Sequence, residues 1–253
     1  MSVKQSVRAK QARATKAPAK KALAKQSRAK KAPAKKRRKV LRGETLRAHA
    51  RAIHARLLAA YPDAHCELDY RNPYELAVAT VLSAQCTDKR VNLVTPELFR
   101  RWPDAHALAA APREEIERVI QSTGFFRNKA KSLAGFANQL VEHHAGTVPA
   151  EMEQLVVLPG IGRKTANVVL GNAFGKNEGI VVDTHVQRLS QRFGLTKESD
   201  AVKVERALIP LFPPASWTLL SHLMIWHGRR VCDARKPRCP ECTLADICPS
   251  AAL

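Results

Sequence analysis

The chain has 253 residues, 45% of them hydrophobic, and a formal net charge of +21. This length is enough for one or two domains with a sizeable core. No apolar run approaches the roughly 18 to 20 residues of a membrane-spanning helix, and no apolar signal-peptide core follows Met1. These features predict an intracellular protein that does not span a membrane.

The positive charge is concentrated at the N-terminus. Residues 1–40 contain 16 Lys or Arg and no Asp or Glu, whereas the other 213 residues carry a net charge of only +5. This composition predicts a disordered basic tail, which would attract polyanions through counterion release. A solubility device and a targeting peptide are the alternatives. Targeting is the weaker one, because the tail has more Lys than Arg and no clear apolar face.

From residue 44 onward, apolar residues recur three and four positions apart, which predicts helices almost throughout. Asn72, Thr87 and Asp183 stand where N-caps are expected, and Pro96 is expected to restart a helix. No segment alternates like a strand, so we expect an all-α fold with many short helices. The expected helices span residues 45–60, 74–85, 114–122, 128–144, 152–158, 163–174, 185–193 and 216–227.

Two glycines, Gly160 and Gly162, lie in a turn between two of these expected helices. They allow the backbone to come close to a ligand, and the free N–H groups of the following helix complete a seat for a phosphate. A dinucleotide-binding turn is excluded because no strand precedes it. A P-loop is excluded because Arg163 separates Gly162 from Lys164. A plain tight turn between packed helices is the alternative.

Four cysteines near the C-terminus are separated by six, two and five residues: Cys232, Cys239, Cys242 and Cys248. Four thiolates in one short loop can bind zinc or an iron–sulfur cluster. Zinc sites usually combine two Cys-x-x-Cys pairs, and only one such pair occurs here, which favours a cluster. Cys66 and Cys86 stand alone, so the cysteines do not form the disulfide framework of a secreted protein.

The glycine turn and the cysteine loop together resemble the endonuclease III family of helix-hairpin-helix, iron–sulfur DNA glycosylases. The resemblance covers residues 46–248, and the four cysteines match the family's [4Fe-4S] loop position by position. It implies two helical domains: a six-helix domain over residues 67–177, which holds the hairpin, and a [4Fe-4S] domain formed by residues 43–66 with 178–253. It also implies a bifunctional DNA glycosylase and AP lyase of base excision repair. Such an enzyme removes oxidised pyrimidines of the thymine glycol type and cleaves 3′ to the abasic site by β-elimination.

The resemblance also assigns catalytic residues. Lys164 corresponds to the family's nucleophile and Asp183 to its essential carboxylate. A carboxylate stabilises the positive charge that builds up on the sugar, and an amine that attacks the same sugar carbon forms a Schiff base. Lys164 must then be neutral part of the time, which burial and the neighbouring Arg163 would favour. Considered alone, Lys164 would be a phosphate contact and Asp183 an N-cap.

The remaining assignments concern DNA contacts. The resemblance implies that Gln85 fills the gap left by the extruded base and that Phe125, where the family has an aliphatic residue, is a second wedge. The other expected DNA contacts are Gly160, Gly162, Arg163 and His185. Two departures from the family are expected to affect substrate preference. Lys164 and Asp183 are 19 positions apart, one more than usual, with the insertion within 176–179, and Cys86 replaces a smaller residue.

The expected partner is double-stranded DNA with a damaged base or an abasic site, and the protein is expected to act as a monomer. The expected location is the bacterial cytoplasm at the nucleoid, or the nucleus or an organelle in a eukaryote. One alternative is a monofunctional adenine glycosylase. That branch lacks the lysine at position 164 and usually adds a C-terminal domain, whereas this sequence continues only five residues beyond Cys248. The other alternative, a non-enzymatic DNA-binding protein, leaves Lys164 and Asp183 unexplained.

Deletion of residues 1–40 is predicted to flatten the salt dependence of non-specific DNA binding, because the deleted segment carries 16 basic residues and each phosphate contact releases counterions. The measurement is the slope of log affinity against log salt concentration for undamaged duplex DNA. An unchanged slope would make the tail a solubility device.

Overall fold

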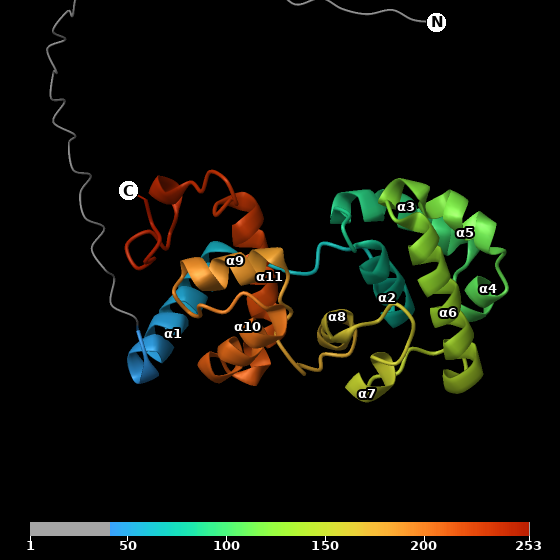
Figure 1. Ribbon diagram of the computed structural model, residues 1–253, viewed down its shortest axis with the longest axis horizontal. Coiled ribbons are helices and arrows are strands. Elements are labelled where there is room, and N and C mark those ends of the chain that lie inside the picture. The colour runs from blue at the N-terminus through green and yellow to red at the C-terminus, as the bar shows by residue number, and fades with distance from the viewer. Residues whose placement is uncertain (1–40, 253) are drawn as a thin grey trace, which may run out of the picture. The chain divides into compact units, whose positions relative to one another are not determined.

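The structure is a computed structural model that describes residues 41–252 (Figure 1). The expected disordered basic tail, residues 1–40, lies outside the described residues. Between residues 41 and 252 every regular element is a helix and there is no strand, so the predicted all-α fold is confirmed. Within the same range, no helix has both the length and the apolar character needed to cross a membrane.

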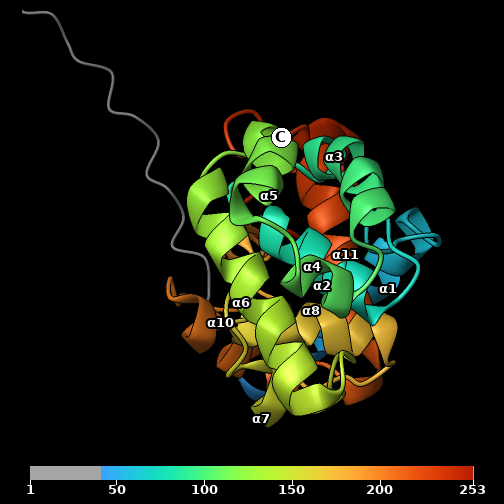
Figure 2. The same cartoon turned by 90° about the vertical axis from the view of Figure 1, so that its right-hand side faces the viewer.

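The larger hydrophobic core is built from the middle of the chain. Helix α2 is at its centre, because every residue from Tyr74 to Leu82 is buried. Helix α6 contacts α2, α4 and α5 (Figure 2). The helices of this core are α2 (Pro73–Leu82), α3 (Asp88–Arg101), α4 (Ala105–Ala109), α5 (Arg113–Ile120), α6 (Phe126–His144), α7 (Met152–Leu155) and α8 (Arg163–Ala173).

A second hydrophobic core joins the first helix of the chain to the last ones. Ile53 and Leu57 of α1 belong to the same buried cluster as Phe193 and Leu220. The chain passes between the two cores twice, through segments 61–72 and 174–183. Whether the two cores are separate domains stays a prediction. The helices of the second core are α1 (Gly43–Ala60), α9 (Thr184–Arg192), α10 (Ala201–Leu208) and α11 (Trp217–Arg230).

Three N-caps follow the sequence expectation. The side chain of Asn72 accepts a hydrogen bond of 2.9 Å from the Glu75 amide, and Thr87 accepts one of 3.3 Å from the Arg90 amide. Asp183 caps α9 in the same way. Each cap satisfies an amide that would otherwise lack a partner in the first turn of its helix.

The expected restart of a helix at Pro96 is wrong, because α3 continues through this residue to Arg101. The proline removes one helical hydrogen bond. Buried residues on both sides of it, including Val91 and Leu98, hold the helix in place by packing. Helices α4 and α10 were not expected. Both begin at aspartate caps, Asp104 and Asp200, whose side chains accept from amides three residues later.

Candidate functional site

The glycine turn joins α7 to α8 as a hairpin, and the two buried residues Leu158 and Ile161 hold it against the core. Gly160 has a positive φ of 80°, and a Cβ atom there would lie 2.9 Å from Cβ of Ser132, so only glycine fits. Gly162 precedes α8 and provides no side-chain cap. The first amides of α8 therefore have no side-chain acceptor and are available to an anion.

Arg163 does not stand free beside this turn. Its Nε lies 3.3 Å from Oε2 of Glu205, a buried residue of α10, and Asn167 of α8 donates to Oε1 of the same carboxylate at 3.2 Å. Glu205 thus ties the hairpin to the second core. The charge of Arg163 is compensated by this carboxylate, so the expected effect of Arg163 on Lys164 is weakened.

Lys164 is the second residue of α8 and is exposed. The expected burial of its amine is therefore not found in the free protein. A group so close to a helix start, on the solvent side of a hairpin, is accessible to a large ligand. Any desolvation of this amine has to come from the ligand that covers it.

Asp183 is half-buried and caps α9. Its Oδ1 accepts from the amides of His185 and Val186, both at 2.8 Å. Within residues 41–252, no group donates to Oδ2. The carboxylate therefore stabilises the helix with one oxygen and keeps the other available. The meeting of Lys164 and Asp183 at one sugar stays a prediction.

The linker between α8 and α9, which contains the expected one-residue insertion, is anchored at several points. Lys176 Nζ donates to the Ala150 carbonyl at 2.9 Å, and Oδ1 of Asn177 accepts from the amide and the hydroxyl of Thr218. Gly179 passes so close to Glu205 that a side chain there would have to displace the Glu205 carboxylate. The segment is thus held by contacts on both sides, and the insertion within it stays a prediction.

His185 faces the start of α9 and the second core. Its Nδ1 lies 3.2 Å from a guanidinium nitrogen of Arg188, and the same nitrogen donates to the carbonyls of Gly228 and Cys232 at 3.0 Å. Burial lowers the pKa of His185, although the nearby Asp183 acts in the opposite direction. A neutral imidazole has one donor and one acceptor nitrogen, so His185 can form a hydrogen bond with a ligand through its ring.

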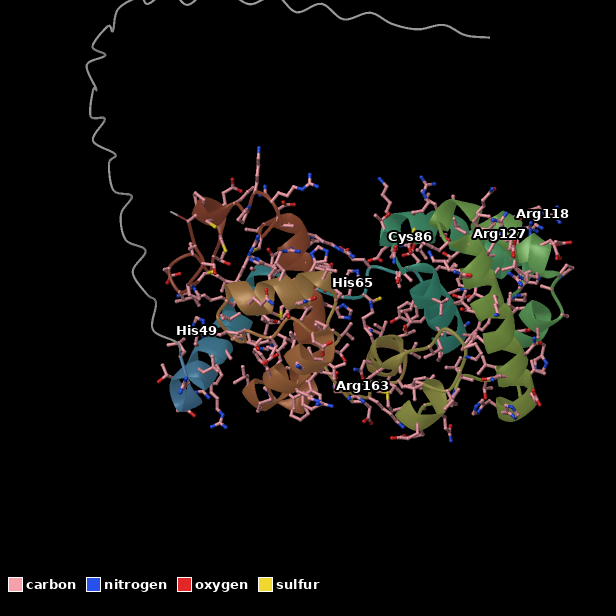
Figure 3. All side chains as sticks on the ribbon, in the orientation of Figure 1. His49, His65, Cys86, Arg118, Arg127 and Arg163 are labelled. Atoms are coloured by element: carbon pink, nitrogen blue, oxygen red, sulfur yellow. The ribbon has the colours of Figure 1, made fainter. Side chains whose placement is uncertain are left out.

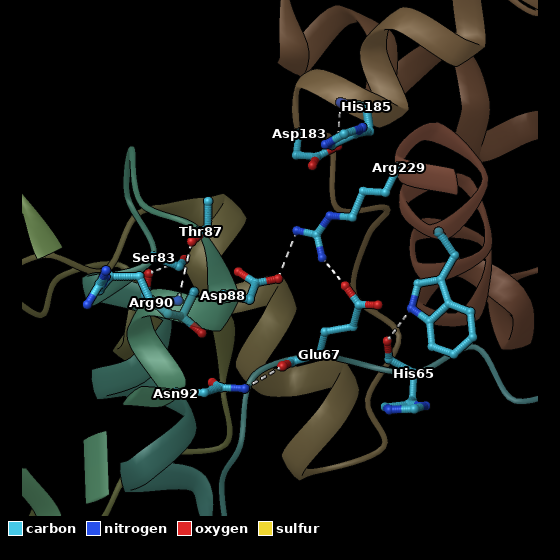
Figure 4. A network of polar contacts seen from close by, with 12 residues as sticks. His65, Glu67, Ser83, Thr87, Asp88, Arg90, Asn92, Asp183, His185 and Arg229 are labelled. Carbon is cyan, nitrogen blue, oxygen red and sulfur yellow. Dashed lines mark hydrogen bonds and ion pairs between the residues drawn. The ribbon is translucent and has the colours of Figure 1, made fainter. Parts of the chain in front are cut away.

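A cavity of about 930 Å³ opens beside His185, between residues of the two cores. Its lining includes Cys86, Asp88 and Arg229. Arg229 reaches from α11 to Asp88 at the start of α3, with an N–O distance of 2.8 Å, and to Glu67 in segment 61–72 (Figure 4). Polar groups from both cores therefore converge at this cavity.

The two expected DNA-inserting residues, Gln85 and Phe125, are both exposed. Each occupies the left-handed region of backbone conformation, with φ angles of 52° and 48°. This conformation is strained for residues other than glycine. The side chain of Phe125 is 63% exposed, which is unusual for a large aromatic residue and leaves it available for contact with a ligand.

The four C-terminal cysteines line one cavity of about 180 Å³. They do not converge on a single point, and no three His, Cys, Asp or Glu residues within 41–252 are arranged to hold one metal ion. Arg192 donates to Sγ of Cys232 at 3.2 Å and the Leu244 amide to Sγ of Cys242 at 3.4 Å, as expected for thiolate ligands.

His227 of α11 connects this cysteine loop to the C-terminal end of α1. Its Nε2 lies 3.5 Å from Sγ of Cys242, and its Nδ1 lies 3.0 Å from the hydroxyl of Tyr61. Burial lowers the pKa of His227 to about 4. The imidazole is therefore neutral at physiological pH, and it can accept from Tyr61 while donating to the sulfur.

Some of these residues were not recognised from the sequence. Glu205 carried a signal, because it lies next to Val204 on the apolar side of a short amphipathic helix, where a charged residue needs a partner. Arg188, which contacts His185 and two main-chain carbonyls, had a weaker signal: it follows His185 by three residues, as neighbours on a helix surface do. The contacts of Arg229 with Glu67 and Asp88 had none, because they join segments more than 140 residues apart.

Comparison with known proteins places these features in a family. Residues 78–214 match the family model described as HhH-GPD superfamily base excision DNA repair protein. Endonuclease III of Synechocystis sp. is 60% identical over 191 residues, which cover 76% of this chain and 87% of the relative. Endonuclease III of Bacillus subtilis is 46% identical over 189 residues, which cover 74% and 86%. A trapped covalent intermediate of endonuclease III with DNA has a TM-score of 0.78 at 43% identity, covering 81% of this chain and 96% of that chain.

Replacement of Asp183 by Ala is predicted to lower the free energy of unfolding by about 1 kcal/mol, because α9 loses its N-cap. Asp183→Asn keeps an oxygen that accepts from the same amides and is expected to unfold close to wild type. The measurement is urea unfolding followed by circular dichroism. Equal losses in the two variants would show that the charge, and not the cap, stabilises α9.

Proposed function

Because the chain belongs to the endonuclease III family of base excision DNA repair proteins, we propose that it removes oxidised pyrimidines from double-stranded DNA. The family assignment makes the chain a DNA glycosylase and AP lyase of base excision repair. The proposal adds the substrate class, of the thymine glycol type, and cleavage 3′ to the abasic site. The observation that supports it is an exposed Lys164 directly after an anion-binding hairpin, in a chain whose Asp183 keeps one carboxylate oxygen available.

The proposed partner is a DNA duplex that contains a damaged base or an abasic site. The open amides at the start of α8 provide a contact for a backbone phosphate, with Gly160 and Gly162 bringing the backbone close to it. Gln85 and Phe125 are exposed and suited to fill the stack when the damaged nucleotide leaves it. The cavity beside His185 has charged residues such as Asp88 and Arg229 in its lining and is large enough for an extruded pyrimidine, whose polar edge can hydrogen-bond to His185.

In the proposed reaction the Lys164 amine attacks C1′ of the damaged nucleotide. The new C–N bond replaces the N-glycosidic bond, and the base leaves as it takes up a proton. The carboxylate of Asp183 stabilises the positive charge that develops on the sugar. The sugar ring then opens to a Schiff base, removal of a proton from C2′ breaks the C3′–O bond, and the 3′ phosphate leaves. Hydrolysis of the imine releases Lys164.

The attack requires a neutral amine, and Lys164 is exposed in the free protein. Burial of the amine therefore accompanies binding of the DNA, which covers the hairpin and excludes water from it. Arg163 contributes less than its position suggests, because Glu205 compensates its charge. We propose that this coupling restricts nucleophilic activity to the DNA complex.

We propose that Cys232, Cys239, Cys242 and Cys248 hold a [4Fe-4S] cluster. The fit rests on the cavity of about 180 Å³ that these four residues line, and on the N–H groups of Arg192 and Leu244 that point at the sulfurs. When bound, such a cluster cross-links the C-terminal loop through four metal–thiolate bonds and is able to exchange electrons. Arg192 also binds the carbonyls of Asp233 and Ala234, which holds the loop against α9.

We further propose that the protein acts as a monomer at the nucleoid of the bacterial cytoplasm. The support for the location is the bacterial origin of its relatives in Synechocystis sp. and Bacillus subtilis.

Wild-type protein is predicted to form a covalent complex with duplex DNA containing thymine glycol when borohydride is present, because borohydride reduces the Schiff base. Lys164→Gln is predicted to abolish this complex. Asp183→Asn, which keeps the cap of α9, is expected to slow base release by about 100-fold or more. The measurement is the amount of trapped complex on a denaturing gel, with strand nicking followed in parallel.

The matched control is Lys203→Gln, which removes an exposed lysine of α10 and is expected to trap like wild type. Strand nicking that persists in Lys164→Gln would refute the assignment of the nucleophile. A wild-type protein that contains its cluster but forms no trapped complex would refute the lyase proposal.

The isolated protein is predicted to contain iron and to show broad absorbance at ~400 nm, as expected of an iron–sulfur cluster. Cys242→Ser is expected to lose both signals, because it removes one of the four thiolates. Cys66→Ser changes a cysteine outside the loop and is expected to keep them. The measurements are elemental analysis and a visible spectrum, and stoichiometric zinc in place of iron would contradict the assignment.

A further inference from the structure

Lys129, in the first turns of α6, is the one buried lysine within residues 41–252, with 5% of its surface exposed. Its Nζ donates to the carbonyl of Leu82 and to the carbonyl of Thr123, both at 2.8 Å. No carboxylate within these residues forms an ion pair with it. Burial lowers the pKa of Lys129. A cation is costly in such a place, so the two carbonyl contacts are its compensation.

The two carbonyls belong to the two segments that lead to Gln85 and Phe125. Leu82 ends α2, where carbonyls lack helical partners and a positive charge is favoured by the helix dipole. Thr123 ends a short 3₁₀ helix and is buried. Gln85 follows Leu82 by three residues, and Phe125 follows Thr123 by two. The ammonium group of Lys129 therefore connects the starts of the two loops that contain Gln85 and Phe125.

The loops need such support, because each has a non-glycine residue in the left-handed region, at Gln85 and Phe125. Conformations of this kind persist only where surrounding contacts hold them. The main-chain amide of Lys129 also donates to the Phe125 carbonyl at 3.1 Å, so the same residue holds the second loop twice. Cys86 and Arg127, which mark the two loops in Figure 3, lie at the same end of this group of helices.

We propose that Lys129 is a positioning residue for DNA insertion: it fixes the spacing between Gln85 and Phe125, so that both side chains enter the duplex together. This inference rests on the proposed function, in which these two residues fill the stack beside the extruded nucleotide. It adds a role for a buried residue that touches neither DNA nor the reacting sugar. The role is needed for duplex substrates, in which a base pair has to be opened and the gap filled.

The experiment compares two substrates: a duplex with thymine glycol, and a single strand with a preformed abasic site, in which no base pair is opened. Lys129→Met, of similar length but without donors, is expected to lower kcat/KM on the duplex by roughly tenfold or more, since small displacements of positioning groups have large effects on rate. Nicking of the single strand is expected to stay within about twofold of wild type. Lys129→Arg, which keeps charge and donors, is expected to recover part of the duplex activity.

Lys131→Met is the matched control, because Lys131 is an exposed lysine of the same helix, and it is expected to resemble wild type on both substrates. A fluorescent base opposite the lesion reports directly on insertion, and its signal is expected to fall in Lys129→Met only. Should this variant unfold below the assay temperature, Lys129→Gln, whose amide keeps one donor group for the two carbonyls, takes its place with the same expectation.

Equal losses on duplex and single strand, or an unchanged fluorescence signal, would reduce Lys129 to a residue that only stabilises the fold and would overturn the inference. Unchanged duplex activity in a folded Lys129→Met would overturn it as well. Failure of the proposed function has a different signature, since wild-type protein would then give no borohydride-trapped complex on the duplex with thymine glycol.

Discussion

The arrangement of the cavity beside His185 depends on the ion pairs of the Arg229 guanidinium group. This group leaves α11 in the second core and binds Asp88 at the start of α3 and Glu67 in segment 61–72 (Figure 4). Although burial acts to lower the pKa of Arg229, its hydrogen bonds with the two carboxylates raise it above the ordinary value. The group therefore stays charged, and it positions α3 relative to α11. Since Asp88 and Arg229 both line the cavity beside His185, the same ion pairs determine the shape of that cavity.

The carboxylate of Glu205 provides a second connection between the two cores, at the hairpin. Glu205 of α10 is buried and binds Arg163 and Asn167 of α8. Glu205 is buried while Arg163 is half-exposed, so loss of these partners would leave a buried carboxylate uncompensated, and the contact constrains the position of its elements. Glu205 and Arg229 therefore have the same role at two different places between the two cores. Each holds an element that carries site residues against an element of the other core.

The sequence predicted the local features well and the long-range ones poorly. Asn72, Thr87 and Asp183 were recognised as N-caps because a cap needs only its own side chain and an amide two or three residues later. Pro96 misled the prediction, because the burial of α3 outweighs the hydrogen bond that proline removes. The partners of Arg229 and Lys129 have no local signature at all.

The same limit applies to the site. The hairpin glycines and the four cysteines were found because their spacing along the chain reflects their chemistry. The exposure of Lys164 and the ion pair of Arg163 were not, because burial depends on elements such as α10 that join the hairpin from later in the chain. Spacing along the sequence therefore reveals which groups are suited to the chemistry. Their burial and ion pairs depend on how the two cores pack together.

The contrast between two lysines supports the choice of Lys164 as nucleophile on physical grounds. Burial lowers the pKa of Lys129, and a lowered pKa is often taken as the mark of a reactive amine. Yet Lys129 is enclosed, and its Nζ is occupied by two carbonyls, so it has no path to a sugar. Lys164 has the opposite properties: it is exposed and stands at a helix start where a phosphate is favoured. Access to the substrate decides between them, because an amine that cannot reach C1′ cannot act as the nucleophile even when it is neutral.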